Sequence, residues 1–127
     1  MRAITDDDLI QSPAAAELFV RIGIGEIDAM ISMTVIFETV FVLESNYRLD
    51  RQAIARAVKA IARAPGIQFL NDEARFIEST LAFYLAHPQL SFADCYHAAL
   101  SLDFCSGEIY TYDRDFNRVA GVTRLEP

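Results

Sequence analysis

The sequence is short of cysteine. Its two cysteines, Cys95 and Cys105, are too few for a disulfide scaffold and do not have the spacing of zinc ligands. If both lie on one helix, they are separated by about 15 Å along its axis, which is too far for a disulfide. We therefore expect two unpaired thiols, most simply two small buried side chains, in a reducing compartment.

Long apolar runs are also missing. A membrane-spanning helix needs about 18 to 20 uninterrupted apolar residues, and the richest stretch, residues 29–43, is interrupted by polar side chains such as Ser32 and Glu38. Residues 1–8 are polar and acidic, without the basic head and apolar run of a signal peptide. We therefore expect a soluble protein of the cytoplasm that does not enter the membrane.

Basic residues are outnumbered. With 11 Lys and Arg against 18 Asp and Glu, the net charge is −7. This balance argues against broad electrostatic adhesion to nucleic acid or to an anionic membrane. It does not exclude an enzyme that acts on nucleic acid, because a carboxylate cluster that binds metal is itself negative and the metal inverts the local field.

What the sequence does contain is enough apolar surface for a real core. The chain is 53% apolar over 127 residues and has no repeat or linker, so we predict one domain spanning residues 1–127. Short apolar segments that suit strands lie at residues 29–33, 67–70, 108–111 and 122–125. Patterns that suit helices lie at residues 14–19 (after Ser12 and Pro13), 35–47, 50–64, 71–86, 91–104 and 115–119. We expect Asp50 to cap the helix 50–64, either Asn71 or Asp72 to cap the helix 71–86, and Ser91 to open the helix 91–104. Strands that alternate with helices predict an α/β fold with a parallel sheet covered by helices.

Three acids stand where this topology places ligands, beyond the carboxyl ends of the strands. Glu38 lies among apolar residues near the start of a helix, where an ionised carboxylate is costly unless it is paired or metal-bound. The competing interpretation is a glutamate that reaches solvent from the helix edge. Asp94 lies in the first turn of an apolar helix, where it also complements the helix dipole. Asp113 follows a predicted strand, where it also suits a turn.

Together the three acids are more informative than each alone. Convergent carboxylates without paired lysines are typical of a Mg²⁺ or Mn²⁺ site, and such metals serve phosphoryl chemistry. Asp115 is a further candidate ligand, although we expect it to cap the short helix that begins there. Arg114 is a candidate phosphate contact, or else a partner of a neighbouring acid.

These residues resemble a known family. The segment Val35–Leu43 looks like the second acidic motif of PIN-domain ribonucleases, Phe92–Ala99 resembles their third motif, and Thr111–Phe116 is similar to their fourth. The order and spacing match the VapC-type toxins of bacterial toxin–antitoxin pairs. The resemblance covers the chain from about Arg2 to Leu125.

The resemblance implies a three-layer α/β/α sandwich with a mainly parallel central sheet. It implies a metal-dependent endoribonuclease that acts on structured RNA such as tRNA or rRNA, an antitoxin that blocks the site, and a homodimer. Glu38, Asp94 and Asp113 correspond to three of the four family acids. The fourth belongs to a first strand ending in "D-T-N" that this sequence does not show; the chain begins with the segment that follows that strand in the family. We therefore expect reduced nuclease activity.

Other residues and other functions have simpler explanations. His97 is expected to pack or bond locally on its helix, and the stripe Arg56, Lys59 and Arg63 is expected to be a solvated face. A PIN-like module that binds an antitoxin without cleaving RNA is the alternative function. A metal-dependent phosphatase on a similar sheet is less favoured, because its nucleophile motif is not visible.

Overall fold

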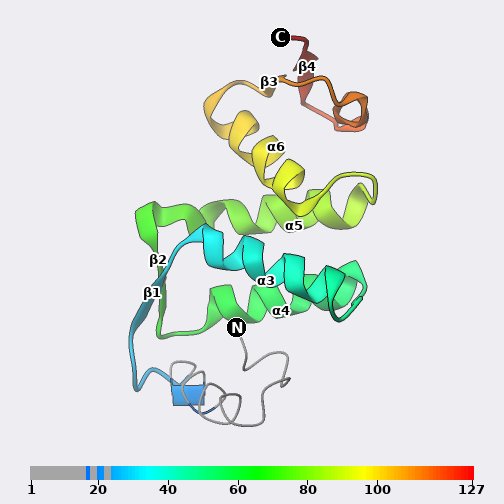
Figure 1. The fold of residues 1–127 in the computed structure, drawn as a ribbon. Helices are drawn as coiled ribbons and strands as arrows, with labels where there is room; N and C mark the ends of the chain where they lie inside the picture. The colour runs from blue at the N-terminus through cyan, green and yellow to red at the C-terminus, as the bar shows by residue number, and fades with distance from the viewer. Residues whose placement is uncertain (1–16, 18–19, 22–23) are drawn as a thin grey trace. The chain divides into compact units, whose positions relative to one another are not determined.

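A computed structural model describes residues 17, 20–21 and 24–127 (Figure 1). The chain divides into two compact units, residues 1–74 and residues 75–127, and each unit is described by itself below. The helix expected after Ser12 lies almost wholly outside the described residues. None of the described helices is long and apolar enough to cross a membrane.

The first unit is built around a parallel strand pair and two helices. Its elements are β1 (Ala29–Ile31), α3 (Met33–Ser45), α4 (Arg51–Arg63) and β2 (Ile67–Phe69). β1 pairs with β2 in parallel, with Ala29 opposite Ile67, and the two helices form the crossover that a parallel pair requires. α4 begins where the sequence predicts, because Asp50 Oδ1 accepts the N–H of Ala53 at 2.7 Å.

The core of this unit lies between α3 and α4. The α3 residues Ile36, Val40 and Leu43 recur at helical spacing and are at most 1% exposed. Ile54 and Val58 of α4 are fully buried at the same spacing. Full burial of side chains of this size stabilises the folded state by about 1.5 to 3 kcal/mol each, so this face holds α3 in place.

The segment between β2 and the next helix departs from the prediction. Asn71 and Asp72 were expected to cap a helix, but both have left-handed backbone angles, with φ of 56° and 59°. They lie in η1 (Leu70–Phe76), a 3₁₀ segment, and α5 (Ile77–Ala86) starts only afterwards. The capping prediction was therefore wrong. Asn and Asp are the side chains that tolerate this left-handed region best, and here they turn the chain sharply after β2.

The second unit repeats the combination of helices and a parallel strand pair. Its elements are α5, α6 (Phe92–Phe104), β3 (Glu108–Tyr110), η2 (Arg114–Arg118) and β4 (Thr123–Leu125). α5 packs on α6, where the rings of Tyr84 and Phe92 meet edge to face with centroids 5.4 Å apart. β3 pairs with β4 in parallel, with Glu108 opposite Thr123.

A close backbone contact joins Gly107, just before β3, to Gly121, shortly before β4. Gly107 has a φ of +83°, and a Cβ at this position would overlap the carbonyl oxygen of Gly121. Only glycine therefore fits at residue 107. The N–H of Thr123 donates to the Gly107 carbonyl at 2.8 Å, and the N–H of Thr111 donates to the Leu125 carbonyl at 2.8 Å. These contacts fix both ends of the segment that carries Asp113.

The α/β class and the parallel strand pairing are as predicted. Within the described residues, the strands form two two-stranded sheets, one in each unit. Cys95 is buried and Cys105 is exposed, and both are free thiols, so the expectation of unpaired cysteines is confirmed. The expected burial of both thiols is wrong for Cys105, which lies at the end of α6 where the helix meets solvent.

Candidate metal centre

Glu38 lies in the second turn of α3, which begins two residues after β1 ends. Its side chain is exposed, although its sequence neighbours are mostly apolar. The reason is helical periodicity, because side chains three and four residues apart share one face of a helix. One face of α3, opposite the buried core face, is exposed and consists of Thr34, Glu38, Phe41 and Ser45. Within the described part of the chain, the Glu38 carboxylate has no hydrogen bond or ion pair, so it is available to a ligand.

Asp94 lies in the first turn of α6 and takes part in a capping box. The N–H of Asp94 donates to Ser91 Oγ at 3.1 Å, and Asp94 Oδ2 accepts the N–H of Ser91 at 3.1 Å. Asp94 therefore has the helix-start role that was weighed against catalysis. The capping box occupies one carboxylate oxygen, and Oδ1 makes no hydrogen bond to any described residue.

Asp113 and Asp115 lie just beyond the carboxyl end of β3. Asp113 is the residue before η2, and its Oδ1 accepts the N–H of Asp115 at 2.9 Å. The N–H of Asp113 in turn donates to Thr111 Oγ1 at 3.1 Å. The expectation that Asp115 caps this helix was therefore wrong, because Asp113 is the cap. Asp113 stands two residues before Asp115 and accepts its backbone N–H, as aspartates in turns commonly do.

Arg114 and His97 are both exposed. Arg114 makes no ion pair with the described acids, so the alternative in which it holds a neighbouring acid is not supported, and its side chain is exposed. His97 lies one turn after Asp94 on α6 and likewise has no polar contact with the described residues. Arg114, which lies between Asp113 and Asp115 in the sequence, therefore stays a candidate phosphate contact.

The donor chemistry of these acids suits a hard divalent cation. The described ion pairs join Arg21 to Glu26, Arg75 to Asp103 and Arg124 to Glu126. None of them involves Glu38, Asp94, Asp113 or Asp115, so these four carboxylates are left without a cationic partner among the described residues. Carboxylate oxygens without basic partners are the ligands that Mg²⁺ and Mn²⁺ prefer.

The same residues do not make a finished cluster. Among the residues that the structure describes, no three His, Cys, Asp or Glu side chains are gathered closely enough to hold a metal ion. Glu38 belongs to the first unit, and Asp94, Asp113 and Asp115 belong to the second. The grouping of the acids into one centre therefore stays a prediction.

A carboxylate that the sequence analysis missed lies at the start of α3. Glu73 Oε2 accepts the N–H of Met33, the first residue of the helix, at 3.0 Å. Ser32, which precedes the helix in the capping position, makes no side-chain cap. The two partners are 40 residues apart in the sequence, so no local pattern could have predicted this contact.

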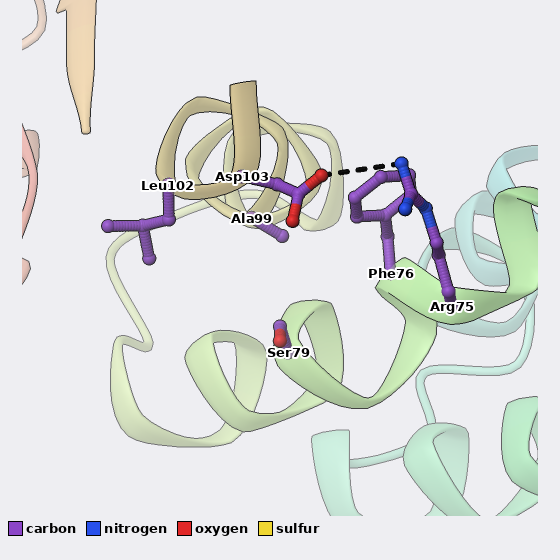
Figure 2. A pocket seen from close by; sticks show the side chains of 6 residues that line it. All are labelled: Arg75, Phe76, Ser79, Ala99, Leu102 and Asp103. Atoms are coloured by element: carbon purple, nitrogen blue, oxygen red, sulfur yellow. Dashed lines mark ion pairs between the residues drawn. The ribbon is translucent and has the colours of Figure 1, made fainter. Parts of the chain in front are cut away.

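The second unit contains a cavity of about 230 Å³, which does not include any of the candidate acids (Figure 2). Its rim carries an ion pair between Arg75 and Asp103 at 3.3 Å. The Arg75 guanidinium lies over the ring of Phe76 at 4.6 Å and over that of Phe104 at 5.3 Å. Ser79 lines the cavity from α5. The charges of Arg75 and Asp103 neutralise each other, whereas the candidate metal ligands have no basic partner among the described residues.

Comparison with known proteins identifies the family. The family model of the PIN domain matches residues 3–122, nearly the whole chain. No curated protein and no solved structure matches the chain. PIN domains are generally metal-dependent nucleases that act on RNA, which agrees with the chemistry of carboxylates that have no basic partner among the described residues. The chain therefore belongs to the PIN-domain family.

Proposed function

We propose that this protein is the toxin of a bacterial toxin–antitoxin pair, a cytoplasmic endoribonuclease of the VapC type that depends on Mg²⁺ or Mn²⁺ and cleaves structured RNA. The observation that carries the proposal is the match to the PIN domain over residues 3–122. It is supported by Glu38, Asp94 and Asp113, which lie near the starts of elements and have no cationic partner among the described residues.

In this proposal Glu38, Asp94 and Asp113 hold the metal, and Asp115 is an additional ligand. When bound, the metal activates water for attack on the phosphodiester and offsets the charge on the phosphate oxygens. Asp94 and Asp113 each use one carboxylate oxygen for a backbone N–H, which orients the side chain and leaves the other oxygen for the metal. Arg114 contributes a guanidinium beside Asp113 that contacts phosphate of the RNA.

Cleavage of a panel of tRNA and rRNA by the purified full chain tests the function. We expect cleavage with Mg²⁺ or Mn²⁺ and none with a chelator. Glu38→Gln, Asp94→Asn and Asp113→Asn are expected to lower the rate about 100-fold or more. Asparagine retains an oxygen that accepts the capping N–H, so these variants remove the charge while keeping the local fold.

Asp103→Asn is the matched control, because it makes the same change on α6 outside the proposed site. Its ion pair with Arg75 is half-exposed on both sides, and such pairs contribute about 0 to 1 kcal/mol. Cleavage that survives Asp94→Asn would remove Asp94 from the site. A well-folded chain that binds an antitoxin and cleaves no RNA with either metal would instead establish the alternative, a PIN module without catalysis.

We also propose that an antitoxin and a second copy of the chain bind this protein. The surface carries large exposed apolar side chains, among them Phe41 at 69% and Tyr112 at 71% exposure, and exposed apolar side chains favour protein partners when they lie together. Co-purification with the product of an adjacent small gene tests the first partner, and light scattering of the purified chain tests the second. A monomer at all concentrations would contradict the homodimer.

A further inference from the structure

The start of α3 is held by a distant carboxylate. The first four N–H groups of a helix have no partner within the helix, and at most helix starts a side chain just before the helix accepts one of them. Ser32 occupies that position here, with extended backbone angles, but its hydroxyl makes no capping bond. Glu73 Oε2 accepts the N–H of Met33 instead, at 3.0 Å.

The backbone before Glu73 is bent in a way that ordinary residues avoid. Asn71 and Asp72 adopt left-handed angles in succession, with φ of 56° and 59°. Such conformations persist only where the surrounding structure holds them in place. The bend follows directly after β2, the strand that pairs with β1, so it returns the chain to the edge where β1 ends and α3 begins.

We infer that Glu73 is a positioning residue for Glu38. The Glu73 carboxylate fixes the first turn of α3, and Glu38 lies in the next turn of the same helix. It also places a negative charge at the positive end of the helix dipole, which favours this arrangement. The inference rests on the proposed function in one respect, namely that Glu38 is a metal ligand.

Hydrogen exchange of the full chain, without metal or RNA, tests the capping role. Glu73→Ala removes the acceptor, and exchange of the amides of residues 33–35 is expected to rise about fivefold, as for the loss of one capping bond. Glu73→Gln retains an oxygen at the same distance and is expected to recover most of the protection. Ser32→Ala and Asp72→Asn are the controls and are expected to leave exchange unchanged.

Mn²⁺ affinity, measured by calorimetry well below the unfolding temperature, tests the positioning role. Glu73→Ala is expected to weaken Mn²⁺ binding and RNA cleavage about tenfold, because small displacements of a reacting group have effects of this size or larger. Glu73→Gln is expected to restore both. A merely structural residue would lower the unfolding temperature and leave the Mn²⁺ affinity of the folded chain unchanged.

The outcomes separate this inference from the proposed function. Unchanged exchange in Glu73→Ala would overturn the inference even if the wild-type chain is a nuclease. Faster exchange with unchanged Mn²⁺ affinity would leave a cap and overturn the positioning role. If the wild-type chain neither binds Mn²⁺ nor cleaves RNA, the proposed function fails and the positioning role fails with it, while the exchange data still decide whether Glu73 sets the start of α3.

Discussion

The first turns of α3 and α6 are closed in different ways. α6 is capped by its own neighbours, because Ser91 and Asp94 exchange hydrogen bonds within one turn. α3 is capped across 40 residues by Glu73. The first arrangement is local and can be predicted from four consecutive residues, whereas the second joins residues that are far apart in the sequence. Both helices carry a candidate metal ligand, so the helices that carry these two acids are capped by different means.

The buried faces of the two helices differ as well. α3 buries large aliphatic side chains such as Ile36 and Leu43 along its length. α6 buries the rings of Phe92 and Tyr96 near its start, and its other buried side chains, such as Cys95 and Ala98, are small. We therefore expect the loss of a buried side chain to cost more at Ile36 than at the small residues of α6. Four predictions test this contrast and the difference between the two caps, in order of decreasing effect.

Removing bulk from the core should cost more at Ile36 of α3 than at Cys95 of α6. Ile36 is fully buried, and Ile36→Ala is expected to lower the free energy of unfolding by about 2 to 5 kcal/mol. Cys95 is also fully buried, but Cys95→Ala removes a single heavy atom and is expected to lower this free energy by about 1 kcal/mol. Denaturant titration of both variants measures the difference. Equal losses would contradict the contrast between these two positions.

Substitutions of Asp94 should separate its two roles. Asp94→Asn and Asp94→Ala are both expected to lower RNA cleavage about 100-fold or more, because both remove the charge. Only Asp94→Ala removes the acceptor in the capping box, and it alone is expected to destabilise the fold by about 1 kcal/mol. Cleavage rates and thermal unfolding of the two variants measure this. Retention of activity in Asp94→Asn with loss in Asp94→Ala would make Asp94 a structural residue only.

Ser91→Ala should weaken α6 directly. The Ser91 hydroxyl accepts the N–H of Asp94, and loss of such a cap costs about 1 kcal/mol in the free energy of unfolding. Ser91→Asp, which retains an acceptor, is the control that should recover stability. If Ser91→Ala leaves the denaturation midpoint unchanged, the capping box does not stabilise α6.

Ser32→Ala should have the smallest effect. Ser32 occupies the N-cap position of α3, as Ser91 does in α6, but its hydroxyl makes no capping bond. A surface substitution of this kind is expected to change the free energy of unfolding by less than about 0.5 kcal/mol. The direct comparison of Ser32→Ala with Ser91→Ala in one denaturation experiment tests the contrast most economically. A loss of 1 kcal/mol or more at Ser32 would contradict it.

Features set by neighbouring residues were predicted well. The caps at Asp50 and Ser91, the end of α6 at Phe104 and the parallel strand pairs all follow from short patterns. The alternation of helices and short apolar strands was sufficient for the α/β class. These features depend on propensities and periodicities that extend over a few residues, so the sequence shows them directly.

Features set by tertiary contact were not predicted. The sequence offered Asn71 or Asp72 as an ordinary helix start, whereas both are left-handed and the next residue, Glu73, contacts Met33, which is 40 residues away in the chain. It also favoured Asp115 over Asp113 as a cap, because both stand at a suitable position and only the turn at Thr111 selects between them. The apolar neighbours of Glu38 gave no indication of which helix face the side chain occupies.

The candidate site was predicted in part. The identities of Glu38, Asp94 and Asp113 came from their places at the ends of strands and the starts of helices, and the structure confirms those places. The proposal that they share one metal depends on how parts of the chain that are distant in sequence come together, and no pattern of neighbouring residues contains that information. Their convergence stays a prediction, which Mn²⁺ binding by the single-acid variants tests.

The contact between Gly107 and Gly121 has a consequence for engineering. The backbone is held where Gly107 meets Gly121 and where β3 pairs with β4. The segment between the two strands therefore starts and ends on fixed backbone, and doubling the length of a flexible loop costs only about 0.6 kcal/mol of closure entropy. Insertions in this segment should therefore be tolerated as long as residue 107 stays glycine and the buried side chains of Phe116 and Val119 are kept.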